Sequence, residues 1–118
     1  MLKDGRLDFE KVYIAIGYTD LRSGINGLAQ LVENEYNMSV FDRKVLFLFC
    51  GRKANVIKGL IWEEDGFILI TKRYEKGHVN WPRNEKELRE ISNQQYHDLL
   101  SGLLIEATVK KVEPKRYS

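Results

Sequence analysis

The pattern of apolar and polar positions begins with an extended segment followed by a helical one. Residues 12–16 are β-branched, aromatic or small and end at Gly17, which predicts a short strand. After Asp20, a suitable N-cap, apolar residues recur every three or four positions. This spacing predicts an amphipathic helix over residues 21–36, with an apolar stripe formed by Leu21, Ile25, Leu28 and Val32.

Two glycines fall inside this helical pattern. Gly24 and Gly27 each cost about 1 kcal/mol relative to alanine in a helix interior. Either the first turn is irregular and the regular helix begins near Ser23, or the glycines allow another backbone to approach closely. We favour the irregular first turn.

The period changes to that of extended chain from residue 44 onwards. Residues 45–50, 56–62 and 67–73 are predicted strands separated by turn residues. Asp65-Gly66 is the clearest turn signal and predicts a two-residue type I′ hairpin. Residues 79–81 add a short edge strand that Pro82 ends.

Helical spacing returns after Pro82. Arg83-Asn84-Glu85 leads into Leu88 and Ile91, and Asn93 is the expected cap of a second short helix containing Tyr96, Leu99, Leu100 and Leu103. We therefore predict an α+β fold: an antiparallel β-meander of three to four strands packed with one helix in the N-terminal half and two short C-terminal helices. Residues 1–106 form the single domain, and residues 107–118 form a basic C-terminal tail that frays.

Composition fits one domain with a modest core. The 118 residues are 43% hydrophobic and 31% charged, with a formal net charge of +2. Cys50 is the single cysteine and lies in an apolar run, so a buried thiol and a reducing compartment are predicted. The start lacks the apolar region of a signal peptide, and no apolar run is long enough to span a membrane. We expect a cytoplasmic protein without membrane association.

Catalytic and metal-binding motifs are absent from the sequence. His78 and His97 lie far apart and Cys50 is the only sulfur ligand, so no zinc set with the usual spacing exists. The remaining candidates are carboxylates, each of which has a simpler role as a helix cap or turn residue: Asp20, Asp42, Glu63, Glu64 and Asp65. No phosphate-binding loop or nucleophile motif is present. We predict neither catalytic activity, nor a metal, nor a cofactor.

The distribution of charge is more informative than the total. Residues 43–76 carry eight basic and four acidic side chains, a net +4, while the rest of the chain sums to −2. Basic side chains on one sheet face with a nearby Trp62 or Trp81 would suit phosphates and stacked bases. The alternatives are a solvated sheet face with edge-protecting lysines, and tryptophans packed in the core.

A series of motifs resembles the TnpB accessory protein of insertion-sequence-66-type transposable elements, from about Val12 to Gly102. The segment from Gly17 to Leu28 reads GYTDLRSGINGL, and later blocks follow in the family's order. The residues that carry the resemblance are Thr19, Asp20, Arg22, Gly24, Gly27, Asp65, Gly66, Lys72, Arg73, Gly77, Trp81 and Pro82. The RNA-guided nuclease that shares this name is unrelated, because it is several times longer and needs a zinc ribbon that one cysteine cannot provide.

The resemblance implies a non-catalytic accessory role in DNA transposition, with the transposase and other element-encoded proteins as partners. Combined with the charge pattern, it leads to the hypothesis that the protein binds transposon-end DNA. The expected phosphate contacts are Arg22, Arg52, Lys53, Lys58, Lys72 and Arg73, with Trp81 as a stacking residue. The alternative is a protein-interaction module that docks on the transposase through a sheet edge or the C-terminal helices without touching DNA.

Overall fold

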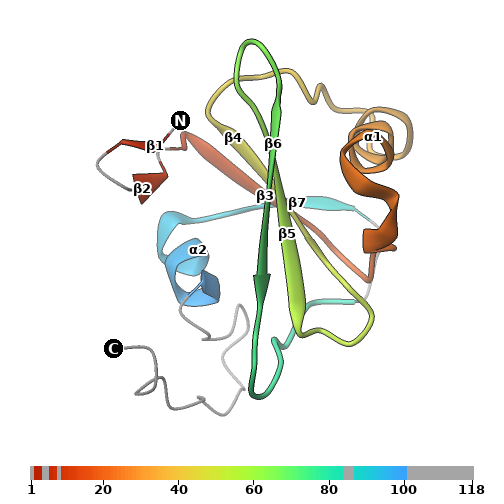
Figure 1. The fold of residues 1–118 in the computed structure, drawn as a ribbon, viewed down its shortest axis with the longest axis vertical. Helices are drawn as coiled ribbons and strands as arrows, with labels where there is room; N and C mark the ends of the chain where they lie inside the picture. Colours follow the sequence, from red (N-terminus) through yellow and green to blue (C-terminus); the bar gives the residue numbers. More distant parts are fainter. Residues whose placement is uncertain (1, 4–5, 8, 84–86, 101–118) are drawn as a thin grey trace.

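A five-stranded mixed sheet forms the centre of the protein, in a computed structural model that describes residues 2–3, 6–7, 9–83 and 87–100 (Figure 1). The strand order is β6-β5-β4-β3-β7. The strands are β3 (Lys11–Ala15), β4 (Val45–Cys50), β5 (Val56–Trp62), β6 (Phe67–Arg73) and β7 (Leu88–Ile91). Two further strands, β1 (Leu2–Lys3) and β2 (Arg6–Leu7), form a separate antiparallel pair.

The expected antiparallel meander is wrong, because β3 and β4 run parallel with Val12 opposite Leu46. The helix between them returns the chain to the end of the sheet from which β3 started, as parallel pairing requires. Antiparallel hairpins do join β4 to β5 and β5 to β6, where the three predicted strands have the predicted bounds.

The crossover from β3 to β4 contains a helical segment over residues 21–35, which confirms the predicted helix. Its apolar stripe packs on one face of the sheet, where Leu28 and Val32 are fully buried with Phe47 and Leu60. The segment consists of a 3₁₀ turn η1 (Leu21–Ser23), the α-helix α1 (Gly24–Gln30) and a π-helical turn η2 (Leu31–Glu35).

The glycines of this segment explain its irregular first turn. Gly24 has φ +71°, a positive value that glycine adopts without steric strain, and it separates the 3₁₀ turn from the α-helix. A Cβ at Gly27 would lie 2.2 Å from Ser23 Cβ, so a side chain there would collide with the preceding turn. The favoured interpretation of the glycines is confirmed.

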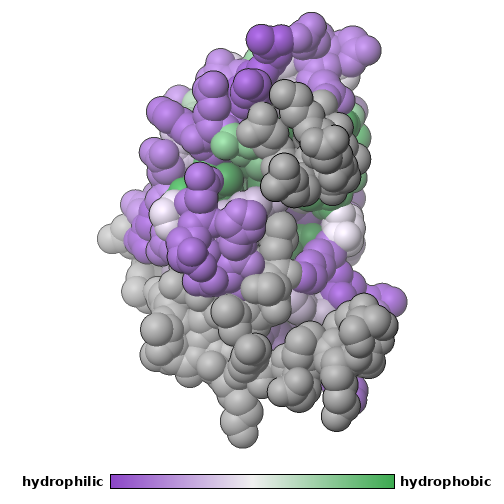
Figure 2. Space-filling model, turned by 90° about the vertical axis from the view of Figure 1, so that its left-hand side faces the viewer, coloured by the Kyte–Doolittle hydropathy of each residue, from purple (hydrophilic) through white to green (hydrophobic). Residues whose placement is uncertain are grey.

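A second core covers the opposite face of the sheet. Trp81 lies there among buried residues of β3, β4 and β5, together with Tyr96 and Leu99 of α2 (Asn93–Leu100). Both faces of β4 are therefore covered, and all six of its residues are buried. On the side of the molecule that carries α2, the described side chains are mainly hydrophilic, and hydrophobic ones show between them in the upper half of the view (Figure 2).

The first of the two predicted C-terminal helices is wrong, because Leu88–Ile91 is strand β7. It pairs antiparallel with β3, with Val12 opposite Ile91. Leu88 and Ile91 share one side of a helix, but in a strand they point to opposite faces, and here each face has a core to receive one of them. The three-residue spacing of Leu88 and Ile91 is therefore compatible with a helix and also with a strand that is covered on both faces.

The second predicted helix is confirmed as α2, but its cap is Ser92 rather than Asn93. The Gln95 N–H donates to Ser92 Oγ at 3.1 Å, and the Ser92 N–H donates to Gln95 Oε1 at 2.9 Å. This reciprocal pair is a capping box. Leu103 and the predicted tail over residues 107–118 lie outside the described residues.

One turn prediction and one strand prediction are also corrected. The β5–β6 connection has four residues, 63–66, and the positive φ belongs to Glu64 at 53° rather than to Asp65 and Gly66, so it is not a type I′ turn. Residues 79–81 are not a strand. Trp81 is buried instead, and its indole N–H donates to the carbonyl of Ala15 at 2.8 Å.

Candidate nucleic-acid interface

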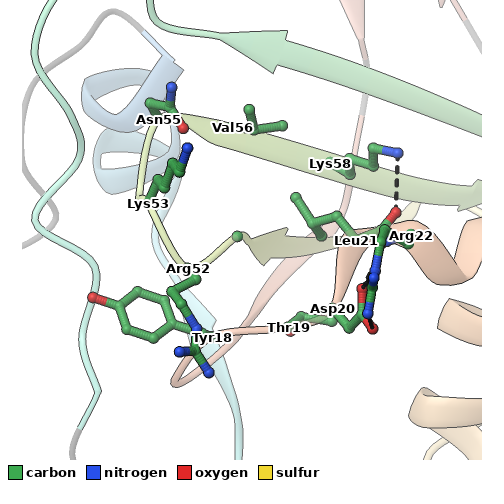
Figure 3. A pocket seen from close by; sticks show the side chains of 11 residues that line it. Tyr18, Thr19, Asp20, Leu21, Arg22, Arg52, Lys53, Asn55, Val56 and Lys58 are labelled. Carbon is green, nitrogen blue, oxygen red and sulfur yellow. Dashed lines mark hydrogen bonds and ion pairs between the residues drawn. The ribbon is translucent and has the colours of Figure 1, made fainter.

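An open groove of about 780 Å³ lies where the two parallel strands end. The loop after β3, the loop after β4 and the first half of β5 line it (Figure 3). In open sheets with parallel strands, ligands bind outside the carboxyl ends of those strands. The lining residues are Tyr18, Thr19, Asp20, Leu21, Arg22, Gly51, Arg52, Lys53, Asn55, Val56 and Lys58.

Two hydrogen bonds hold the walls of the groove together. The Thr19 N–H donates to the carbonyl of Cys50 at 2.8 Å, which joins the loop after β3 to the end of β4. Lys58 Nζ donates to the carbonyl of Leu21 at 3.2 Å, which joins β5 to the start of the helix (Figure 3). This bond holds the Lys58 ammonium group at the groove, and its carbonyl partner does not neutralise the charge.

Arg52 and Lys53 occupy the tip of the β4–β5 turn. The Ala54 N–H donates to the carbonyl of Gly51 at 2.9 Å, so the two basic residues are the central positions of a tight turn. Ala54 follows with φ +59° and is itself buried, which fixes the turn against the protein. Both basic side chains are exposed.

Among the described residues that line the groove, Asp20 alone is acidic, and Arg22 forms hydrogen bonds with it. The Arg22 backbone N–H and Nε both donate to Asp20 Oδ1 at 3.0 Å, and Nη2 donates to Oδ2 at 2.9 Å. These hydrogen bonds to the Arg22 side chain and backbone lower the pKa of Asp20 to about 2. Asp20 therefore stays ionised and compensates much of the charge of Arg22, whose side chain is 90% exposed.

The electrostatic result is a groove with three uncompensated cations. Among the residues that the structure describes, no ion pair involves Arg52, Lys53 or Lys58. Guanidinium and ammonium groups on an open, wet surface are typical ligands of phosphate oxygens. Thr19 and Asn55 add polar side chains beside them.

The structure brings four of the seven predicted contact residues together, namely Arg22 with the three uncompensated cations. Arg73 stands opposite Val56 in the β5–β6 ladder, so it shares the sheet face of Lys58 and flanks the groove. It forms an ion pair with Glu75 at 3.4 Å.

Lys72 and Trp81 do not join this group. Lys72 stands opposite Ile57 on the other sheet face, where its Nζ lies 4.9 Å from the centre of the Tyr74 ring. Burial lowers the pKa of Lys72. Trp81 is 2% exposed, so its side chain is not accessible for stacking on a base, and the core-packing alternative is the one observed.

Sequence reasoning missed the polar walls of the groove. Tyr18 lies under the guanidinium of Arg83, which is 5.1 Å from the ring centre, and Asn55 follows the turn. Their proximity depends on the parallel pairing of β3 with β4, which the local patterns did not indicate. Thr19 was part of the family signature, and that was the one available signal.

The described segments hold neither a metal cluster nor a membrane-spanning helix. Within them, no group of three or more His, Cys, Asp or Glu side chains could hold a metal ion. No helix there is long and apolar enough to cross a membrane. Cys50 is completely buried, as predicted, and burial raises the pKa of its thiol to about 12.

The fold and groove define a small α/β protein with a mixed sheet, one crossover helix and a cationic cleft at the ends of its parallel strands. The chain belongs to the IS66 Orf2-like family, whose model matches residues 10–110. This confirms the resemblance and extends it beyond Gly102. Membership implies an accessory role associated with transposition, alongside element-encoded transposase proteins.

Two relatives from Sinorhizobium fredii (strain NBRC 101917 / NGR234) are similar over most of the chain. The uncharacterized protein y4hO is 38% identical over 94 residues, which are 79% of this chain and 80% of the relative. The uncharacterized protein y4jC is 26% identical over 93 residues, 79% of each chain. No solved structure gives a significant match.

Proposed function

We propose that the protein is a non-catalytic accessory factor of transposition that binds DNA of its element through the cationic groove. The observation that carries the proposal is the convergence of Arg52, Lys53 and Lys58 at the ends of the two parallel strands, with Arg22 at the rim. Three different segments supply these cations, so the cluster is a product of the fold. A lysine-protected edge alone would not produce it.

The groove suits a phosphodiester backbone rather than a buried small molecule. The groove is open, and Arg52 and Lys53 at its turn are exposed. Their charges can therefore contact a large polyanion without burying it. Contacts of this kind bind and orient DNA without reading its sequence. Binding should therefore depend strongly on salt.

Charge reversal at the turn tip tests the proposal. In the Arg52→Glu/Lys53→Glu variant, affinity for duplexes of the element's ends should fall by about tenfold per lost contact near ~0.1 M salt. The slope of log affinity against log salt should decrease by about one unit per contact. Fluorescence anisotropy across a salt series measures both quantities. Exposed turn positions should change the free energy of unfolding by no more than about 0.5 kcal/mol each.

A matched control uses the other end of the same two strands. Lys11 and Lys44 are exposed and lie where β3 and β4 begin. Lys11→Glu/Lys44→Glu gives the same change in net charge, and we expect it to retain most of the affinity and the salt slope. Equal losses in both double variants would show a non-specific charge effect and contradict a role for the groove.

Docking on the transposase without DNA contact is the second candidate. Phe41 favours it, because this side chain is 52% exposed and lies against Trp62 and Phe67, with ring centres 5.0 and 5.7 Å away. Exposed aromatic clusters are typical of protein interfaces. Co-purification with the transposase that survives nuclease treatment and is lost in Phe41→Ser, together with full transposition by the turn variant, would select this candidate.

A further inference from the structure

Strand β6 is an edge of the sheet and offers a row of backbone hydrogen-bonding groups. Among the described residues it pairs with β5 alone. The Tyr74 N–H donates to the carbonyl of Asn55 at 2.8 Å, on the β5 side. Because bonding alternates along an antiparallel ladder, the N–H and C=O groups of Phe67, Leu69, Thr71 and Arg73 point away from β5.

This edge lacks most of the features that block strand pairing. β6 is seven residues long and contains neither proline nor glycine. Its first four residues, 67–70, are apolar and all half-buried, and they alternate between the two faces. Ile68 packs against the core on the α2 side, while Phe67 and Leu69 pack against the core beneath the helix. Half-buried apolar residues of both cores therefore lie along this one edge strand.

The sequence of β6 is complementary to itself in the antiparallel direction. With Ile70 opposite Ile70, the whole strand overlaps, Leu69 lies opposite Thr71, and the basic Lys72 and Arg73 lie opposite Ile68 and Phe67. Like charges do not meet anywhere along the strand. Ile70 contacts its own copy, and the aliphatic parts of Thr71, Lys72 and Arg73 lie over the apolar residues opposite them. We propose that two copies of the chain associate through β6, with the twofold axis at Ile70, to form one continuous ten-stranded sheet.

This arrangement places the two grooves on the same side of the dimer. An antiparallel pair of identical strands has its twofold axis perpendicular to the sheet, so equivalent faces stay together. Lys58 stands opposite Thr71, one residue from the axis. With strands about 4.8 Å apart and about 3.4 Å per residue, the two Lys58 Cα atoms would be about 16 Å apart. The dimer would thus present one basic surface made from both copies.

The first test is sedimentation velocity of the full chain without DNA over a range of protein concentrations. We expect the wild type to dimerise. Thr71→Pro removes an outward N–H and should raise the dimer dissociation constant at least about tenfold, while its bonds to β5 are kept. Thr71→Ala is the matched control and should still dimerise. A wild type that stays monomeric, or a dimer that Thr71→Pro leaves intact, would overturn the proposal.

A second test does not depend on the folding of the proline variant. In the proposed register, the Cα atoms of two opposed residues 70 would be about 4.5 Å apart, within the range of a disulfide. Ile70→Cys should therefore form a covalent dimer on mild oxidation, whereas Thr71→Cys should not, because its two copies would be offset along the strands. Native Cys50 is buried and does not compete. Equal cross-linking of the two variants, or none in either, would contradict the register. Neither test involves DNA, so failure here is distinct from failure of the groove proposal.

Discussion

At Gly27, helix propensity and packing make opposite demands. Alanine is favoured over glycine by about 1 kcal/mol in a helix interior, so propensity alone predicts that Gly27→Ala stabilises the protein. The 2.2 Å approach to Ser23 Cβ predicts the reverse. We expect a loss of about 1–3 kcal/mol, the usual cost of overpacking.

Urea unfolding of Gly27→Ala shows directly whether the substitution stabilises or destabilises the protein. Asn26→Ala is the matched control, because Asn26 is exposed in the same helix, and it should be neutral or slightly stabilising. A stabilised Gly27→Ala would mean that the first turn rearranges at no cost.

At the scale of elements, the cap of α2 is the clearest test of the corrected boundaries. Ser92→Ala removes the acceptor for the Gln95 N–H and should cost about 1 kcal/mol of stability. Asn93→Ala should cost much less, because the structure places Asn93 inside the helix. Thermal unfolding monitored by circular dichroism compares the two variants, and a larger loss at Asn93 would restore the original assignment of the cap.

How far the sequence predicted the fold depends on how local each signal was. The bounds of β4, β5 and β6 followed from apolar runs and turn residues. β7 was misassigned because spacing alone does not separate a helix from a strand that is covered on both faces. The parallel pairing of β3 with β4 is a long-range property, and no residue within either strand specifies it. The capping box of Ser92 and Gln95 was readable as S-x-x-Q.

The basic residues of the candidate site could be predicted from the sequence, but the sheet face of each one could not. The basic turn was visible as Arg52-Lys53, and Lys58 followed from the charge count. Local patterns did not show which sheet face each lysine takes, so Lys72 was grouped with Lys58 although the two point in opposite directions.

For the whole molecule, a buried thiol and two tyrosine hydroxyls should lower the stability of the fold at alkaline pH. Burial raises the pKa of the Cys50 thiol from 9.0 to about 12, and burial also raises the pKa values of Tyr74 and Tyr96. The unfolded chain would release these protons at a lower pH than the folded protein does. The stability they contribute is therefore fully present below about pH 9 and is lost as pH rises towards 12.

Urea titrations between pH 8 and 12 should show the unfolding midpoint falling across this window. Cys50→Ala removes one of the responsible protons, so its midpoint should fall less steeply from a lower starting value. A wild-type midpoint that is constant to pH 11 would contradict buried, protonated side chains at these positions.

The strand order also sets the order in which the chain can fold. β4, β5 and β6 are joined by short turns, so closing their ladders costs little chain entropy. The crossover that contains the 21–35 helix separates β3 from β4, and β7 must reach back along the chain to place Ile91 beside Val12, so these two pairings close longer loops. Proteins rich in such distant pairings fold slowly. Pulsed hydrogen exchange during refolding should therefore protect β4 and β5 before β7. Until then the β7 side of β3 is a second open edge, and the folding intermediate is the species most exposed to aggregation.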